Sequence, residues 1–306
     1  MGLKIAVIGA GGVGGYFGGR LAAAGHNVSF VARGEHLATL RRDGLAVTSV
    51  AGDFTVAPVR ATDDATEIGV VDFVLLAVKT WQLGPAITAL KPLVGGETAV
   101  VTTQNGVDAP EQVAEAVGKE AVLPGAAEVI AFLDGPGRIR HRSGGKLTFA
   151  EWDSRPSARV ERLRDALLET GLTAVVATDV WAALWGKFLA LASVGAIGTL
   201  TDAPYGVLRA HAGTWQLIAD SMTEIHQVAR ARGINLPDDV VATNIAFLDK
   251  LPADGTTSLQ RDIRAGKPSE LEAWTGAVVR LGRETGTPTP VNSVLYELAS
   301  ARAQRP

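Results

Sequence analysis

Residues 3–26, LKIAVIGAGGVGGYFGGRLAAAGH, constrain the fold more than any other stretch. The apolar run at 3–10 predicts a buried strand, and the Ala- and Gly-rich segment that follows predicts a helix ending near Gly25. The turn between them has the G-x-G-x-x-G pattern, in which the glycines allow a tight turn, a close approach of the backbone to a pyrophosphate, and close packing of helix on strand. We therefore expect the phosphates of a dinucleotide at the positive end of this helix. The residues of this predicted site are Gly9, Ala10, Gly11, Gly12, Val13 and Gly14.

The alternative is a glycine-rich turn of the kind found in any α/β protein, and the preceding KIAVI favours the dinucleotide interpretation. The end of the second predicted strand, 27–33, indicates which dinucleotide binds. An acidic residue there would bind a ribose 2′-hydroxyl, but the position holds Arg33, whose guanidinium fits a 2′-phosphate. We expect NADP(H). Glu35 lies close by, and we place it in the first turn of the next helix, where a carboxylate is favourable.

Strands and helices alternate through the first part of the chain, which predicts a parallel, doubly wound sheet of the Rossmann type with helices on both faces. Further strands are expected at 70–79, 98–106 and 172–178, a β-hairpin or meander at 133–152, and a helix at 155–171. After residue 179 the pattern is helical, with helices at 213–233, 269–286 and 292–304, the second beginning at a Ser-x-x-Glu capping box. We therefore expect a Rossmann-type domain over 1–178 and an all-helical domain over 179–306.

Composition limits the classes of partner. The 306 residues carry a net charge of −3 and show no basic face, so nucleic acid is not indicated. There is no cysteine, and the five histidines lack metal-ligand spacing, so we expect no metal. We recognise no signal peptide and no apolar run that would span a bilayer, and we expect a cytoplasmic protein.

Lys79 and Asn105 each follow the carboxyl end of a predicted strand, where open α/β sheets bind ligands. A solvated loop lysine and a turn residue in QNG are the alternatives, and the residues alone leave both open.

Lys187 is the one charge in the apolar stretch WAALWGKFLALASVGAIGTL, residues 181–200. A lysine on an apolar helix must extend its amine to water, pair with a carboxylate or face a polar cavity. Its apolar neighbours Trp185 and Phe188 leave little solvent face, and it follows the expected domain boundary, where a cleft is anticipated. In such a cleft the amine could donate a proton to the alkoxide that forms when hydride reaches a carbonyl carbon, and Glu270 is the candidate to orient it.

With these residues identified, the chain resembles the ketopantoate reductase (2-dehydropantoate 2-reductase) family over essentially its whole length. The motifs that carry the resemblance are IGAGGVGG at 8–15, AVKTWQ at 77–82, QNGV at 104–107, WGKF at 185–188, SLQRDIRAGKPSELEAWTG at 258–276 and GTPTPVNSVLYEL at 286–298. The resemblance implies NADPH-dependent reduction of a 2-oxo acid, a role in pantothenate biosynthesis, and a homodimer formed through the helical domain.

The resemblance also implies roles for single residues. It places Arg33, Lys79 and Gln82 at the adenosine 2′-phosphate, and Asn105 at both the nicotinamide ribose and the substrate. It makes Lys187 the proton donor. It makes Ser258 a contact of the substrate carboxylate, and Glu270 the acidic residue beside the lysine and the cofactor.

The chain departs from the family on the helix of Lys187. Relatives that reduce ketopantoate carry asparagines four and eight residues after the lysine, on the same helix face, and this chain has Leu191 and Gly195 there. An apolar wall cannot select for a substrate hydroxyl as an amide does. Ketopantoate is thus the default substrate, and the alternatives are a relative that reduces a more apolar or bulkier carbonyl or imine compound, or an NADP(H)-binding regulator without turnover. The retained Lys187, Ser258 and Glu270 argue against the regulator.

Overall fold

The chain divides into two units, and the computed structural model describes residues 2–304. Unit 1 comprises residues 1–104 and 109–180, and unit 2 comprises residues 105–108 and 181–306. The short segment Asn105–Asp108 therefore belongs with the helical unit, although it lies far from that unit in sequence.

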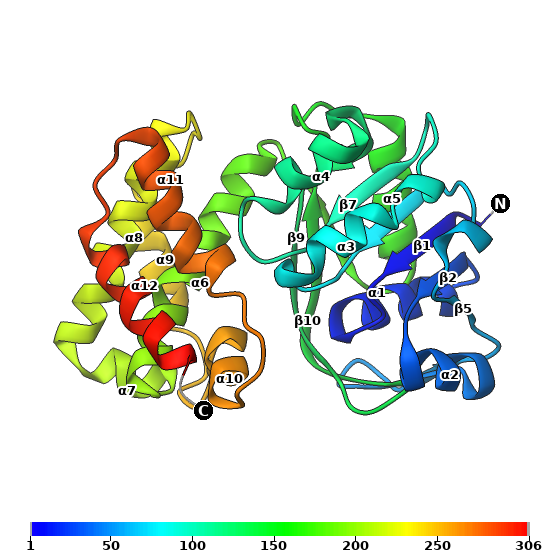
Figure 1. The fold of residues 1–306 in the computed structure, drawn as a ribbon, viewed down its shortest axis with the longest axis horizontal. Coiled ribbons are helices and arrows are strands. Elements are labelled where there is room, and N and C mark those ends of the chain that lie inside the picture. The colour runs from blue at the N-terminus through cyan, green and yellow to red at the C-terminus, as the bar shows by residue number, and fades with distance from the viewer. Residues whose placement is uncertain (1, 305–306) are drawn as a thin grey trace. The chain divides into compact units, whose positions relative to one another are not determined.

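Unit 1 is built on a six-stranded sheet in the order β5-β2-β1-β6-β7-β8, in which every pair of neighbours is parallel (Figure 1). The strands of this sheet are β1 (Lys4–Ile8), β2 (Asn27–Val31), β5 (Arg60–Thr62), β6 (Phe73–Leu76), β7 (Ala99–Thr102) and β8 (Val122–Leu123). The chain runs outward from β1 to β2 and β5, then returns to β6 on the other side of β1. The predicted doubly wound Rossmann-type sheet is confirmed.

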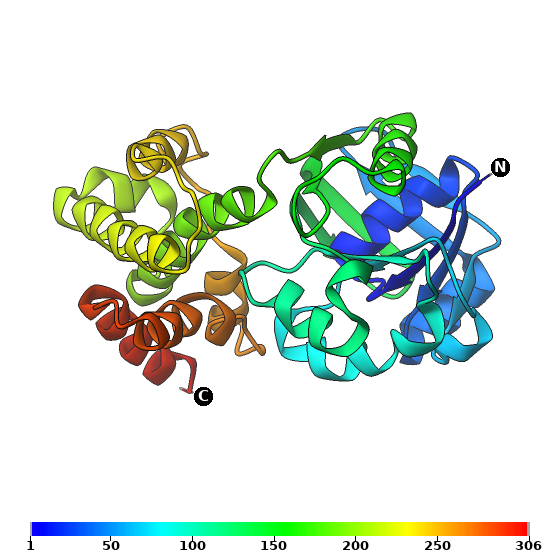
Figure 2. The same cartoon turned by 90° about the horizontal axis from the view of Figure 1, so that it is seen from above.

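Both faces of this sheet are buried, which explains why its strands are apolar without alternation. In β1, Ile5 and Val7 enter one hydrophobic cluster, whereas Ala6 and Ile8 enter another on the opposite face. The helices of the unit are α1 (Gly12–Ala23), α2 (Gly34–Asp43), α3 (Leu83–Thr88), α4 (Ala109–Val117) and α5 (Ala158–Glu169). The side chains of α1 and α5 join the cluster of Ile5, and those of α3 and α4 join the other, so the two groups of helices cover opposite faces (Figure 2).

A second, five-stranded sheet lies against α1 and was only partly predicted. Its strands are β3 (Leu45–Ser49), β4 (Phe54–Val56), β9 (Gly125–Leu133), β10 (Arg138–Phe149) and β11 (Thr173–Val176). The hairpin or meander expected within 133–152 is only partly right, because Arg138–Phe149 is one continuous strand with irregularities near Gly144, and it pairs antiparallel with the earlier strand β9. Strands β3 and β4 were missed. They are short, and β4 is partly or fully exposed along its length, which leaves little pattern to read.

Unit 2 is helical, as expected. Its helices are α6 (Val180–Thr201), α7 (Tyr205–Ala210), α8 (Ala212–Ala231), α9 (Val240–Leu248), α10 (Ser258–Arg264), the π-helical turn η5 (Glu272–Gly276), α11 (Ala277–Thr285) and α12 (Pro290–Ala303). One hydrophobic cluster includes side chains from α6, α8, α9, α11 and α12. A buried polar contact joins α8 to α12, because the Glu224 carboxylate accepts the backbone N–H groups of Val291 and Asn292 at 2.8 and 2.9 Å and so caps α12.

The expectation of no bilayer-length apolar run is wrong on length and composition alone, because α6 has 22 residues and a mean hydropathy of 1.6 over its most apolar window. Two thirds of that window, 67%, is buried within the protein. A helix that is apolar on all sides is also what the centre of a helical bundle requires, since its neighbours cover every face.

Candidate active site

The carboxyl ends of the central parallel strands meet at one edge of the sheet. Ile8, the last residue of β1, pairs with Val31 of β2 and with Leu76 of β6. The order of the strands reverses beside β1, and such a switch point is where open α/β sheets bind ligands. The glycine turn follows β1 directly, so the sequence-predicted dinucleotide residues lie at this edge.

The geometry of the glycine turn fits a bound phosphate. Gly9 has φ +95°, and a side chain there would meet the backbone of Ala77 and Val78 at 2.8–2.9 Å. Gly11 is the N-cap of α1 and has no capping side chain, and the space where its Cβ would lie is open. The first turn of α1 carries no acidic residue. The helix therefore presents its N–H groups and positive dipole end without a side chain of its own in the way.

Gly12 and Gly14 show why the turn keeps its shape. A Cβ on Gly12 would lie 2.1 Å from the Ala131 carbonyl oxygen of β9, and one on Gly14 would lie 2.2 Å from the Gly9 carbonyl oxygen. Because any side chain would push the turn from its neighbours, both positions require glycine.

The residues predicted for the adenosine end share this edge of the sheet. Arg33 lies two residues after β2, is the N-cap of α2, and is exposed. Glu35 lies in the first turn of α2, as predicted. Lys79 is half-buried at the start of the short helix η2 (Thr80–Gln82), and Gln82, exposed, ends that helix.

Gln104 is a structural residue that sequence reasoning missed. Its side chain is 6% exposed, and its amide donates to the Leu76 and Val78 carbonyl oxygens at 2.8 and 3.1 Å. Thr103 also donates to the Leu76 oxygen, at 3.0 Å. These bonds fasten the segment after β7 to the segment that leads into Lys79. The QNG sequence offered only a turn signal, and nothing in it showed that the glutamine side chain is buried.

Lys187 and Asn105, predicted separately, form a hydrogen bond within unit 2. The Lys187 ammonium donates to the Asn105 Oδ1 at 2.9 Å, across 82 residues of sequence. Lys187 is half-buried on α6, between Gly186 and the buried Phe188. The backbone near Asn105 is held close to the C-terminal helices, since Val107 is part of the helical core and Asp108 accepts from Arg280 at 2.5 Å.

The face of α6 beyond Lys187 is apolar. Leu191 is half-buried and packs on the helical core. Gly195 is covered by an indole, because a Cβ there would lie 2.8 and 2.9 Å from Cζ3 and Cε3 of Trp274. Trp274, which sequence reasoning also missed, is 1% exposed, and its Nε1 has no hydrogen-bond partner among residues 2–304. The space that an asparagine at 195 would need is filled by this ring.

Glu270 and Ser258 both lie in the C-terminal part of unit 2. Glu270 is 3% exposed, and a carboxylate so deeply buried needs charge compensation. It lies at a bend, two residues before the π-helical turn η5 begins. Ser258 is half-buried at the first position of α10, beside the N-cap Thr257.

The expected capping box at the start of the helix 269–286 is wrong. Regular helical structure begins only at Glu272, whose carboxylate accepts the Tyr296 hydroxyl at 2.7 Å instead of capping a backbone N–H. The N–H of Gly276 bonds the carbonyl oxygen of Leu271 at 3.1 Å, five residues back, which defines the π turn. Such turns insert an extra residue into a helix and are frequent at functional sites.

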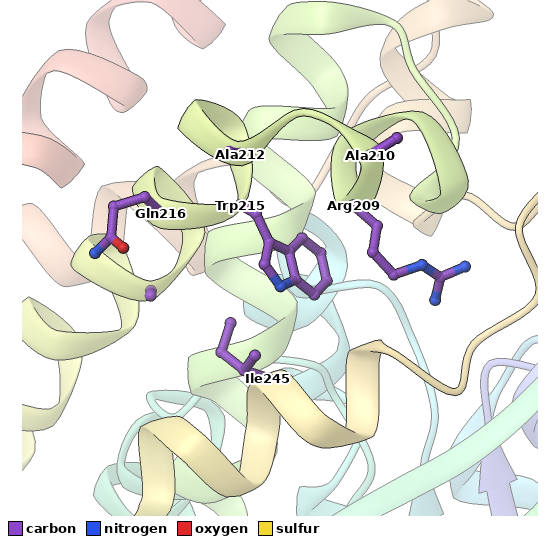
Figure 3. Close-up of a pocket in the computed structure, with 7 residues that line it drawn as sticks. Arg209, Ala210, Ala212, Trp215, Gln216 and Ile245 are labelled. Atoms are coloured by element: carbon purple, nitrogen blue, oxygen red, sulfur yellow. The ribbon is translucent and has the colours of Figure 1, made fainter.

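A separate hollow of about 410 Å³ lies between α7, α8 and α9 and contains none of the predicted site residues. Trp215 lies between Arg209 and Ile245 in this hollow (Figure 3). The Arg209 guanidinium is used by the fold, because it donates to the carbonyl oxygens of Leu248 and Leu251 near the end of α9.

The phosphate-binding geometry of the glycine turn, together with a lysine–amide pair in a helical unit, defines a class of protein, the nicotinamide-dinucleotide-dependent oxidoreductases. Two family models then match the chain, "Ketopantoate reductase PanE/ApbA" over residues 5–154 and "Ketopantoate reductase PanE/ApbA C terminal" over residues 179–303. The chain belongs to the ketopantoate reductase family, and it is an NADP(H)-dependent oxidoreductase that acts on a CH–OH/C=O group.

Relatives match along nearly the whole chain. The 2-dehydropantoate 2-reductase of Mesorhizobium japonicum is 32% identical over 96% of this chain and 96% of its own length. The crystal structure of a PanE/ApbA family ketopantoate reductase from Ralstonia eutropha superposes with a TM-score of 0.90 at 32% identity, covering 98% of each chain. A D-mandelate dehydrogenase solved with NADH and anilino(oxo)acetate shares the fold, with a TM-score of 0.90 at 24% identity over 98% of each chain.

Proposed function

We propose that this protein reduces a 2-oxo acid to the 2-hydroxy acid with NADPH, and that Lys187 supplies the proton. The observation that carries the proposal is the 2.9 Å hydrogen bond from the Lys187 ammonium to Asn105 Oδ1. It brings together a candidate proton donor and a candidate substrate-binding amide that lie 82 residues apart in sequence.

The chemistry requires one hydride and one proton. NADPH, when bound, supplies the hydride to the carbonyl carbon. An ammonium has three N–H donors, and the bond of one of them to Asn105 helps to fix its direction. A second N–H of Lys187 then serves the carbonyl oxygen, hydrogen-bonding it in the ground state and protonating it as negative charge develops there. The Nδ2 of Asn105, at the other end of the same amide, is a donor suited to a substrate oxygen.

The remaining assignments are carried over from the family resemblance. We assign the pyrophosphate to residues 9–14 and the 2′-phosphate to Arg33, Lys79 and Gln82. Ser258 supplies a hydroxyl to the substrate carboxylate. Glu270, buried close in sequence to the π turn, supplies the negative charge that compensates the lysine and contacts the cofactor.

Ketopantoate is the default substrate because of the family, and a more apolar 2-oxo acid is the second candidate. The second is favoured by the α6 face, where Leu191 offers only hydrocarbon and the Trp274 ring covers Gly195. Neither Leu191 nor Gly195 has a side-chain group that could form a hydrogen bond with a substrate hydroxyl.

A matched pair of substrates tests this choice. Ketopantoate and 3,3-dimethyl-2-oxobutanoate differ by one hydroxyl, and NADPH oxidation at 340 nm gives kcat/KM for each. A site that bonds the hydroxyl would reject the analogue lacking it by about 10⁴–10⁵, whereas an apolar wall would discriminate by far less or favour the analogue. Turnover of neither compound, nor of a wider panel of 2-oxo acids, would contradict the proposed reaction.

We also propose a homodimer formed through the helical unit, in the cytoplasm. Val294 and Leu298 lie one turn apart on α12 and are 59% and 54% exposed, which gives that helix an apolar outer stripe. Sedimentation of wild type against a Val294→Glu, Leu298→Glu variant tests this, because the charges should halve the mass if the stripe joins two copies. A monomeric wild type would contradict it.

A further inference from the structure

His36 connects the glycine turn to the rest of unit 1 through both of its ring nitrogens. It lies half-buried in the first turns of α2. Its Nε2 is 2.9 Å from the Ala10 carbonyl oxygen, and its Nδ1 is 2.9 Å from the Gly137 backbone nitrogen. Because a carbonyl can only accept and a backbone N–H can only donate, the ring must carry its proton on Nε2.

The two hydrogen-bond partners of His36 lie in the glycine turn and at the tip of the β9–β10 hairpin. Ala10 is the residue between Gly9 and Gly11 in the glycine turn. Gly137 ends the tight turn between β9 and β10 and has φ +67°. The tip of that hairpin is itself fixed, because the Gly137 oxygen accepts from Ala46 of β3 at 2.9 Å.

The hairpin also touches the turn directly. The Cα of Gly12 is so close to the Ala131 carbonyl of β9 that a Cβ would collide with it. The hairpin therefore supports the glycine turn at two points, by this contact at Gly12 and through the His36 ring at Ala10.

We propose that His36 is a positioning residue for cofactor binding, which holds the glycine turn in its phosphate-binding shape by bonding it to the β9–β10 hairpin. The proposal rests on the assignment of residues 9–14 as the pyrophosphate site. A turn that is already held in the bound shape loses less conformational freedom when the dinucleotide binds, and its affinity is higher for that reason. Burial lowers the pKa of His36 below 6.5, which agrees with a ring held neutral between these two partners.

Two substitutions separate the two bonds. His36→Gln places an amide nitrogen near the position of Nε2 and can still donate to Ala10. His36→Asn places an oxygen near the position of Nδ1 and can still accept from Gly137, but it does not reach Ala10. The dissociation constant for NADPH, measured by the quenching of protein fluorescence, should rise about tenfold in either variant, because each keeps one bond of His36 but breaks the link between the glycine turn and the hairpin. The kcat at saturating NADPH should change little in either variant.

His26→Ala is the matched control for general destabilisation. This histidine is also in unit 1 and also accepts a backbone N–H, from Leu3 at 3.1 Å, but its bond is at the far end of α1 from the glycine turn. The variant should lower the melting temperature and leave the NADPH dissociation constant unchanged. If His36→Asn behaves in the same way, His36 is merely structural and the proposal is overturned.

Gly11→Asp distinguishes failure of this inference from failure of the site assignment. A carboxylate at Gly11 would occupy the open space above the turn and repel phosphate, so it should abolish NADPH binding. Loss of binding in Gly11→Asp with normal binding in His36→Asn refutes only the role of His36. Normal binding in Gly11→Asp refutes the phosphate site itself.

A measurement on the wild-type protein covers the case in which His36→Asn does not fold. NADPH should slow amide hydrogen exchange at Gly137, whose N–H donates to His36, together with exchange in the glycine turn. A Gly137 amide that does not respond while the turn becomes protected would overturn the proposal.

Discussion

Gly195→Ala tests the packing that replaces a polar wall beside Lys187. The new methyl group would lie 2.8 and 2.9 Å from two ring atoms of Trp274, where ordinary carbon contacts are about 3.5–4.0 Å. Trp274 is 1% exposed, so the ring has little room to move away. The variant should therefore be overpacked.

Two opposing terms set the magnitude. Replacing glycine by alanine inside a helix gains about 1 kcal/mol from intrinsic helix propensity. Forcing an extra methyl into a packed core costs about 1–3 kcal/mol. Gly186→Ala isolates the first term, because it lies on the same helix and a Cβ there meets no atom within 4 Å apart from its chain neighbours and the nearby backbone of its own helix. Gly195→Ala should thus be about 1–3 kcal/mol less stable than Gly186→Ala.

Urea unfolding followed by far-ultraviolet circular dichroism measures both free energies, and Trp274→Leu completes a double-mutant cycle. Removing the ring should relieve the overpacking, so the two changes should be non-additive by about 1–3 kcal/mol in the favourable direction. Additivity, or equal stability of the Gly186 and Gly195 variants, would show that the ring does not occupy this space. The same result decides how the site could be redesigned, because an asparagine at 195 would fit only after Trp274 is made smaller.

The remaining predictions concern the reaction, the cofactor and pH. Lys187→Ala should lower kcat by about 10²–10⁴ with an unchanged NADPH dissociation constant, and a near-wild-type rate would remove the lysine from the mechanism. Arg33→Ala should raise the KM for NADPH by about 10–100-fold and leave that for NADH almost unchanged, so an unaltered ratio of the two would contradict the 2′-phosphate assignment. The pKa of His36 is lowered by burial, so the unfolded chain binds a proton at a higher pH than the native protein does. The contribution of the neutral His36 ring to stability is therefore complete above pH 6.5 and is lost as the pH falls through the lower native pKa. The urea concentration at half-unfolding should consequently fall less on acidification in His36→Gln than in wild type.

The order of elements was readable from the sequence where a buried strand meets a glycine turn or where a helix has a long periodic face. The strand at 4–8 with its following helix, and α6, α8 and α12 of unit 2, are cases of this kind, whereas the shorter α7, α9 and α10 were not predicted. The second sheet was only partly readable. β3 and β4 are 5 and 3 residues long and pair with each other, and only the pairing of β3 with the distant β10 joins them to the sheet, which local pattern does not report.

Site residues could be predicted when their chemistry differed from that of the surrounding segment, as the charge of Lys187 does in an apolar helix. Residues that act by packing or by bonding backbone gave no such signal. Trp274 looks like any core aromatic, and His36 like any helix histidine, until the structure shows Gly195 beneath one and Ala10 beside the other. The Lys187–Asn105 contact depends on a four-residue segment that leaves the Rossmann unit to join the helical one, and no periodicity in the sequence marks that departure.

The sequence of α1 contains one packing signal that the sequence analysis did not use. The dinucleotide pattern needs glycine at 9, 11 and 14, but α1 continues with Gly15, Gly18 and Gly19, which in a helix cost stability unless close packing requires them. A Cβ on Gly18 would meet Val7 of the first sheet at 2.7 Å, and one on Gly15 would meet Ile139 of the second at the same distance. Glycines on two faces of one helix thus indicate a helix held between two layers. Because α1 cannot shift between two sheets, its N-terminus and the turn before it stay in place, and the same constraint that costs helix propensity gives the phosphate site its rigidity.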